Sequence, residues 1–186
     1  MPTDARGRLI GSAIELMRRN GAAGTGVNEL VEHSGVARRS IYTNFPGGKD
    51  ELLAAATTAA GKFISAGIRK DEDPQAALAS FVAMWRTVLV ESDFDAGCPI
   101  AAGALAGTAS PAARAAAGEV FEHWQERLSG VLESHGAAPD EAATLATVIL
   151  SAVEGAVILA TASRSLVPVD RVSSQLSTMI DAAIGG

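Results

Sequence analysis

Six hydrogen-bonding side chains lie within seven consecutive residues near the N-terminus, and their types suit contact with DNA. They are Arg38, Arg39, Ser40, Tyr42, Thr43 and Asn44. Arginine, serine, threonine and asparagine side chains can reach phosphate oxygens or base edges, and a tyrosine hydroxyl can donate to a phosphate. Two arginines alone more often belong to a solvated surface, so their meaning depends on the elements that hold them. If neighbouring helices position the segment, it is predicted to be a recognition helix.

Apolar residues around this segment predict two short helices joined by a tight turn. Val27, Leu30 and Val31 repeat at helical spacing, and Gly35 stands where a positive φ costs least. The apolar side of the next helix consists of Val36, Ile41 and Phe45. Two helices with this connection form a helix-turn-helix motif. Because similar geometry also occurs as plain helix packing, the residue types must decide between the two interpretations.

Those residue types resemble the helix-turn-helix signature of TetR-family transcriptional repressors. The matching residues are Gly35 and Val36, then Ser40 to Pro46, and then Lys49 to Leu52. The stretch from Phe45 to Lys49, together with Gly97 to Ile100, is similar to the LmrA/YxaF-like branch, whose members regulate efflux or detoxification genes. The remainder of the chain resembles the family in its helical layout.

The resemblance implies an all-α protein of about nine helices that acts as a homodimeric repressor. It implies a DNA-binding domain over residues 1–48 and an effector-binding and dimerisation domain over residues 49–186. Such a repressor binds a pseudo-palindromic operator in double-stranded DNA until a small-molecule effector releases it. It also implies DNA contacts by Thr25 and Lys49. Gly26 and Ala37 depart from the pattern, because they lack the hydroxyl that usually caps each helix there.

Helical patterns continue along the rest of the chain. A first helix ends at Asn20-Gly21, a fourth is expected from about residue 50 to 70, and a fifth follows the break at residues 71–74. Pro99 suits the start of a sixth, and Ser110-Pro111 that of a long seventh. Acidic residues at 140 and 141 favour the start of an eighth helix, and Pro168 and Asp170 that of a ninth.

Residues 145–162 of the expected eighth helix are apolar on nearly every face, which requires burial. We predict that this helix and the ninth form a four-helix interface with a second copy of the chain. The small residues expected to allow close approach are Ala142, Ala146, Ala152, Ala156 and Ala160. A transmembrane helix is a poor alternative, because Thr147, Ser151, Glu154 and Thr161 interrupt the run.

Composition supports a helical, cytoplasmic regulator. Hydrophobic residues make up 48% of the 186 residues but aromatic residues only 4%, and the abundance of alanine favours helix. Residues 1–50 hold seven Lys and Arg against five Asp and Glu, whereas the rest holds eight against sixteen. Affinity for polyanions is therefore expected at the N-terminal end. One cysteine permits no internal disulfide, and the first residues do not resemble a signal peptide.

The larger domain contains the residues expected to bind the effector. An effector site needs apolar walls with a few polar groups, and the larger domain holds most of the few aromatics. The candidates are Phe63, Phe81, Trp85, Phe94, Cys98, Phe121, Trp124 and Glu154. Ordinary core packing is the competing interpretation of each aromatic, and an internal hydrogen bond is that of Glu154. We expect a small apolar or aromatic effector.

The sequence shows no clear motif for a metal site, a redox-active thiol or an enzyme active site. The residues Glu119, Glu122, His123 and Glu126 share helical spacing but are more simply a solvated face than a metal site, so we expect neither metal nor cofactor. Cys98 beside Pro99 could be an acidified thiol, although packing explains it better. A small helical enzyme is one alternative, but no nucleophile and base are evident. A constitutive DNA-binding protein without an effector is the other.

Overall fold

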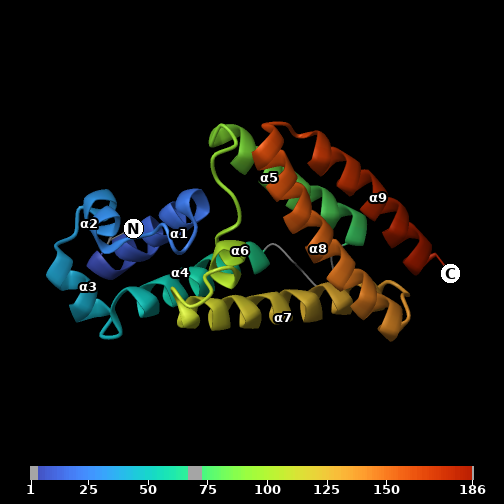
Figure 1. Ribbon diagram of the computed structural model, residues 1–186. Helices are drawn as coiled ribbons and strands as arrows, with labels where there is room; N and C mark the ends of the chain where they lie inside the picture. Colours follow the sequence, from blue (N-terminus) through green and yellow to red (C-terminus); the bar gives the residue numbers. More distant parts are fainter. Residues whose placement is uncertain (1–3, 67–72, 186) are drawn as a thin grey trace. The chain divides into compact units, whose positions relative to one another are not determined.

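The computed structural model describes residues 4–66 and 73–185, and within these ranges the chain forms helices and no strand (Figure 1). In chain order the helices are α1 Ala5–Asn20, α2 Val27–Ser34, α3 Arg38–Asn44, α4 Gly48–Ser65, α5 Pro74–Glu91, α6 Pro99–Ala104, α7 Pro111–Ser134, α8 Pro139–Ser163 and α9 Val167–Ile184. The predicted all-α fold of nine helices is confirmed for the described residues. The part of the predicted fourth helix beyond residue 66 lies outside them.

The chain folds into two compact units. The first contains residues 1–63 and 98–120, and the second contains residues 64–97 and 121–186. These units differ from the two domains expected from the sequence because α6 and the start of α7 pack with the N-terminal helices. The expected boundary at residue 48 was drawn between two functions, and it stays a prediction.

The first unit is built on α1, whose two ends are set by local signals. The Asp4 carboxylate accepts a hydrogen bond from the Gly7 N–H at 2.7 Å, which satisfies one of the free donors of the first turn. At the other end, Gly21 has φ 70° and its N–H donates to the Met17 carbonyl. The buried face of α1 includes Leu9, Ala13 and Met17. This helix therefore forms a support for the helix-turn-helix.

The turn between α2 and α3 has the left-handed glycine that the sequence predicts. Gly35 has φ 62° and ψ 21°, and its N–H donates to the Val31 carbonyl at 3.0 Å. Two side-chain contacts fasten this turn to α1: the Arg8 guanidinium donates to the Ser34 carbonyl, and His33 Nδ1 lies 2.9 Å from Ser12 Oγ. Because α1 holds the end of α2 in this way and also contacts α3, α3 has a defined position in the first unit.

A carboxylate of α4 secures the start of α7 within the same unit. Asp50 Oδ1 accepts hydrogen bonds from the Ser110 hydroxyl and from the Ala112 N–H, the latter at 3.2 Å. Ser110 was expected to cap α7. In the structure its hydroxyl instead donates to Asp50, which binds the first turn of α7 directly. A negative charge at a helix N-terminus is stabilising because unsatisfied N–H groups point toward it.

The second unit packs α5, α8 and α9 together. The helices α8 and α9 run antiparallel side by side, joined by a short turn (Figure 1). Arg86 of α5 pairs with Asp170 of α9, and Gln75 bonds to the Ser177 carbonyl at 2.8 Å. These contacts order α5 antiparallel to α9, because the early residue of α5 meets the late part of α9.

Four of the five α8 alanines expected to face a second chain are buried within the chain instead. Ala142, Ala146, Ala156 and Ala160 are buried inside a single chain, and Ala152 is half-buried. The prediction that these residues contact a second chain is therefore wrong for the four buried alanines, and for Ala152 it stays a prediction. Small side chains permit close helix packing in any core, and here they serve the packing within the chain. Among the described residues α8 alone is long and apolar enough to cross a membrane, a test that buried core helices also pass.

The loop between α5 and α6 is fastened to the end of α8 by ion pairs. Arg164 donates to Asp93 and, at 3.2 Å, to Asp95. The neighbouring Asp93 carboxylate raises the pKa of the Arg164 guanidinium above its ordinary value. Asp93, Phe94 and Arg164 all have φ between 49° and 60°, a region that costs energy for residues other than glycine. Among the described residues, the left-handed residues other than glycine thus lie in the two connections that these ion pairs join.

Candidate DNA-binding face and effector site

Helix α3 has one buried side and one exposed polar side. Ile41, within the helix, and Phe45, which ends it, are fully buried in the core of the first unit. Arg38, Arg39, Tyr42 and Thr43 are exposed, with Tyr42 exposing 51% of its surface. We use the term recognition face for these four residues together with Lys49, which lies half-buried at the start of α4. The charges and hydroxyls of the recognition face are suited to contacts with phosphates and base edges.

The two arginines of the recognition face differ in their contacts. The Arg38 guanidinium donates to the Asn28 carboxamide of α2, so it partly serves to hold the two helices together. Arg39 makes no side-chain hydrogen bond or ion pair with the described residues, and its guanidinium projects from an exposed position. Five donors in a planar fork suit bidentate contact with a phosphate or a guanine. Arg39 is accordingly the stronger candidate for a direct DNA contact.

Three predicted DNA-binding residues use side-chain groups within their own segment. Asn44 Nδ2 donates to the Ser40 carbonyl at 2.8 Å, and Thr43 Oγ1 donates to the Arg39 carbonyl at 3.1 Å. The side-chain oxygen of each residue can still accept a hydrogen bond. Thr25 is fully buried, and its hydroxyl donates to the Gly21 carbonyl at 2.8 Å. In this position Thr25 supports the chain before α2 and does not offer its hydroxyl to a phosphate.

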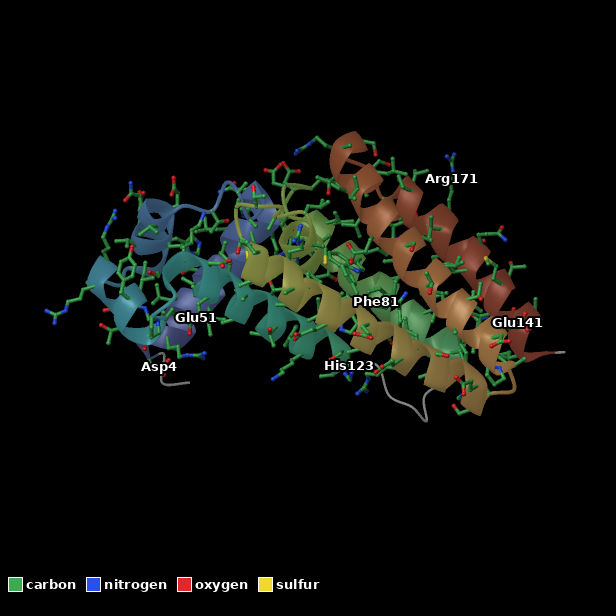
Figure 2. All side chains as sticks on the ribbon, turned by 60° about the horizontal axis from the view of Figure 1, so that its bottom comes forward. Asp4, Glu51, Phe81, His123, Glu141 and Arg171 are labelled. Carbon is green, nitrogen blue, oxygen red and sulfur yellow. The ribbon has the colours of Figure 1, made fainter. Side chains whose placement is uncertain are left out.

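The turn after α3 places Lys49 by backbone geometry. The Gly48 N–H donates to the Phe45 carbonyl at 2.8 Å, and the Gly47 N–H donates to Glu51 Oε2 at 2.7 Å; the Glu51 side chain is labelled in Figure 2. Gly48 has φ 69°, and a side chain there would lie 3.4 Å from the Tyr42 ring. The positive φ of Gly48 therefore fits the turn that brings Lys49 beside the end of α3, and the Gly47 N–H adds a bond to α4.

The candidate effector residues divide between the two units. Trp85 of α5 and Trp124 of α7 are buried in the second unit, and each has an edge-to-face aromatic neighbour on its own helix. These neighbours are the half-buried Phe81, labelled in Figure 2, and Phe121. Ring centroids lie 6.3 Å and 5.8 Å apart, within the range of favourable aromatic pairs. Four of the predicted aromatic residues therefore form two local pairs, each within a single helix.

The remaining candidates occupy different surroundings. Phe94 is half-buried in the loop before α6, and Glu154 of α8 is half-buried with both carboxylate oxygens shielded from solvent. Phe63 and Cys98 belong to the first unit. Phe63 exposes 80% of its surface, which is unlike the wall of a closed site, whereas the buried Cys98 precedes the first turn of α6. Within the described residues no three His, Cys, Asp or Glu side chains gather as metal ligands.

Two residues with unusual side-chain surroundings, one at the recognition face and one in the second unit, were not identified as candidate site residues from the sequence. Asn28 of α2 accepts from Arg38, a contact between positions ten residues apart for which the sequence holds no signal. Thr161 of α8 has a buried hydroxyl oxygen with no hydrogen-bond partner among the described residues. A signal for Thr161 did exist. It lies seven residues after Glu154 and so on the same face of the helix.

Comparisons with known proteins agree with this arrangement. Residues 9–56 match the family model described as bacterial regulatory proteins, tetR family, and residues 74–175 match that of the transcriptional regulator LmrA/YxaF-like C-terminal domain. An uncharacterized HTH-type transcriptional regulator of Mycobacterium tuberculosis strain H37Rv is 38% identical, over 94% of this chain and 93% of that one. The HTH-type transcriptional regulator LmrA of Bacillus subtilis is 25% identical, over 95% and 97% of the two chains.

Solved structures have the same fold. The crystal structure of regulatory protein TetR from Rhodobacter sphaeroides superposes with a TM-score of 0.83 and 22% identity, covering 94% of this chain and 98% of that one. A TetR transcriptional regulator from Legionella pneumophila gives a TM-score of 0.83 with 21% identity, over 96% and 98% of the chains.

Proposed function

The chain belongs to the TetR family of bacterial transcriptional regulators, and from this premise we propose that it is a homodimeric repressor released from its operator by a small molecule. A regulator of this kind acts in the bacterial cytoplasm on double-stranded DNA with pseudo-palindromic half-sites, because a two-fold dimer presents two recognition helices. The observation that carries the proposal is the division of α3 into a buried apolar side and an exposed recognition face.

The proposed DNA contacts come from the recognition face. Arg39 and Lys49 supply charge for phosphates or guanine, and Tyr42 supplies a hydroxyl beside them. The test is a gel shift of the protein with the intergenic DNA upstream of its own coding sequence, with and without candidate compounds. Specific binding that a compound reverses supports the repressor. Specific binding that no compound reverses would instead indicate a constitutive DNA-binding protein.

The proposed dimer uses the outer side of α8. Small or hydroxyl side chains follow this side at helical spacing, as expected where two helices approach closely, and two large apolar residues interrupt them. The residues are Thr144, Thr147, Ser151, Gly155, Ile158, Leu159 and Ala162. Ile158 and Leu159 expose 57% and 59% of their surfaces in the single chain. Adjacent exposed apolar residues are typical of a surface that a partner covers.

Leu159→Arg is expected to convert the dimer into monomers. A two-fold interface would receive two charges from this one substitution, and burial of an unpaired charge costs several kcal/mol, so the dissociation constant should rise more than about a hundredfold. Sedimentation velocity over a series of micromolar concentrations measures this change.

Val90→Arg is the matched control. Val90 lies on α5 of the same unit and exposes 56% of its surface, so the same charge enters at another exposed apolar position. This variant should remain dimeric. A dimer that persists in Leu159→Arg, or a wild-type protein that is monomeric at these concentrations, would contradict the interface.

The proposed effector site lies in the second unit. Trp85, Trp124 and Phe81 offer apolar and aromatic contacts, and Glu154 adds a shielded carboxylate on α8. Such a mixture of aromatic walls with few polar groups is typical of small-molecule sites. Compounds that bind there should change tryptophan fluorescence, since both tryptophans belong to this unit.

A further inference from the structure

Two buried polar groups of the second unit lack hydrogen-bond partners among the described residues. Trp85 is only 2% exposed, and no atom of the described chain accepts from its Nε1–H. Thr161 Oγ1 is likewise shielded from solvent and without a partner there. Most buried polar groups in proteins are hydrogen-bonded, because an unsatisfied one keeps its desolvation cost. Two such groups in one helical unit therefore require a physical explanation.

Thr161 differs from three other hydroxyl residues of its helix, and unlike Ser151, which also makes no such bond, it is not exposed to solvent. Thr144, Thr147 and Ser163 each donate to the carbonyl four residues earlier, at 2.7 to 3.1 Å. This local bond is the usual way to satisfy a hydroxyl within a helix. Thr161 does not make it, although it lies in the interior of α8. Its hydroxyl is thus oriented away from the local bond.

Ion pairs place both groups at the same end of the second unit. Arg86, the residue after Trp85, pairs with Asp170 near the start of α9. Arg164, three residues after Thr161, pairs with Asp93 in the loop that follows α5. The end of α5, the end of α8 and the start of α9 are thereby fastened together. Trp85 and Thr161 lie on the parts of α5 and α8 that these pairs join.

Resting on the proposed effector response, we propose that Trp85 and Thr161 form an acceptor-binding site, which takes a ligand that presents a carbonyl, ether or ring-nitrogen acceptor on an apolar body. The indole Nε1–H is only a donor, so the ligand atom facing it must accept a hydrogen bond. The Thr161 hydroxyl can donate to the same ligand or accept from it. The ligand is selected for its acceptor and needs no positive charge.

Nuclear magnetic resonance of the full-length protein labelled with ¹⁵N at tryptophan tests this site directly. The chain has two tryptophans and therefore two indole signals, which Trp85→Phe assigns. Quinoline and naphthalene serve as matched probes, since they differ in one ring nitrogen. Fluorenone and fluorene form a second pair that differs in a carbonyl. Quinoline and fluorenone should shift the Trp85 indole proton downfield, whereas naphthalene and fluorene should not.

Affinity ratios provide an independent measurement. In the wild-type protein quinoline should bind more tightly than naphthalene, and Trp85→Phe should reduce this preference by about tenfold, because the buried ring nitrogen then keeps its desolvation cost without a donor. Taking a ratio cancels the effect of the smaller ring. Thr161→Val preserves shape and should reduce the preference as well. Thr87→Val, which removes an exposed hydroxyl of α5 bonded to the Ala83 carbonyl, should leave it unchanged.

The outcomes separate this site from the proposed repressor. A Trp85 indole signal that no acceptor probe moves, or a preference unchanged in Trp85→Phe and Thr161→Val, overturns the acceptor-binding site. If another compound still releases the protein from operator DNA, the effector-responsive repressor stands without this site. If acceptor probes move the Trp85 signal while no compound affects DNA binding, the acceptor-binding site stands and the effector response fails.

Discussion

Arg39→Ala should lower operator affinity by roughly a hundredfold, the largest effect expected from one side chain of the recognition face. A bidentate arginine contact is worth about 1 to 3 kcal/mol, and a dimer on two half-sites loses it twice. The Arg39 guanidinium makes no side-chain hydrogen bond or ion pair with the described residues, so its removal should leave the fold intact. Gel shifts or fluorescence anisotropy at two salt concentrations measure the loss.

Salt dependence identifies the kind of contact that Arg39 makes. A lost phosphate contact should reduce the slope of log affinity against log salt by about 0.9 for each half-site, whereas a lost base contact should leave the slope nearly unchanged. Arg114→Ala is the matched control, because it removes the same charge from an exposed position on α7 of the same unit. Equal affinity of Arg39→Ala and Arg114→Ala for the operator would contradict the assignment of α3.

Phe45→Ala should destabilise the first unit by about 3 to 5 kcal/mol, the usual cost of deleting a buried phenylalanine ring. Phe45 is fully buried where α3 ends, and the Arg6 guanidinium lies 5.1 Å from its ring centroid. Its removal leaves a cavity beneath the recognition face. Guanidinium unfolding followed by circular dichroism measures the change, and operator binding should weaken in parallel.

Phe63→Ala provides the same chemical change at an exposed position. Phe63 belongs to α4 of the first unit and exposes 80% of its surface, so the substitution should cost less than about 0.5 kcal/mol. A loss of stability similar in Phe45→Ala and Phe63→Ala would show that the core of the first unit is not centred on the motif.

The sequence predicted the first three helices well because local signals define them. Gly21 and Gly35 adopt the positive φ expected at helix ends, and Val27 begins α2 directly after the expected cap position. Periodicity assigned the buried side of α3 correctly, since Ile41 and Phe45 are the only large apolar residues there. Local sequence carries such information because caps and periodicity act within a few residues.

Contacts between distant residues were beyond the sequence. Asp50 and Ser110 meet across sixty positions, and a cap that seemed local to α7 proves to depend on α4. Alanine on α8 was misassigned for a different reason. Alanine fits equally well in a core and at an interface between chains, so its spacing indicates a face without telling what covers that face. The burial of four of these alanines resolves their place, and burial is known only from the structure.

The candidate effector residues show the same limit. Composition located most aromatics in the larger part of the chain, but it could not separate the exposed Phe63 from the buried Trp85. Nor could it show that Thr161 lacks the local bond made by its neighbours on α8. Such distinctions depend on side-chain direction, which neither residue type nor spacing determines.

The two-sided construction of α3 has an evolutionary consequence. Its exposed residues, Arg39, Tyr42 and Thr43, contribute little to the core, whereas Ile41 and Phe45 are fixed by packing. After gene duplication, mutations on the exposed side could therefore alter which promoter a copy recognises at almost no cost in stability. Paralogous regulators in one genome can then diverge in target while keeping an identical scaffold, which limits cross-talk between their regulons.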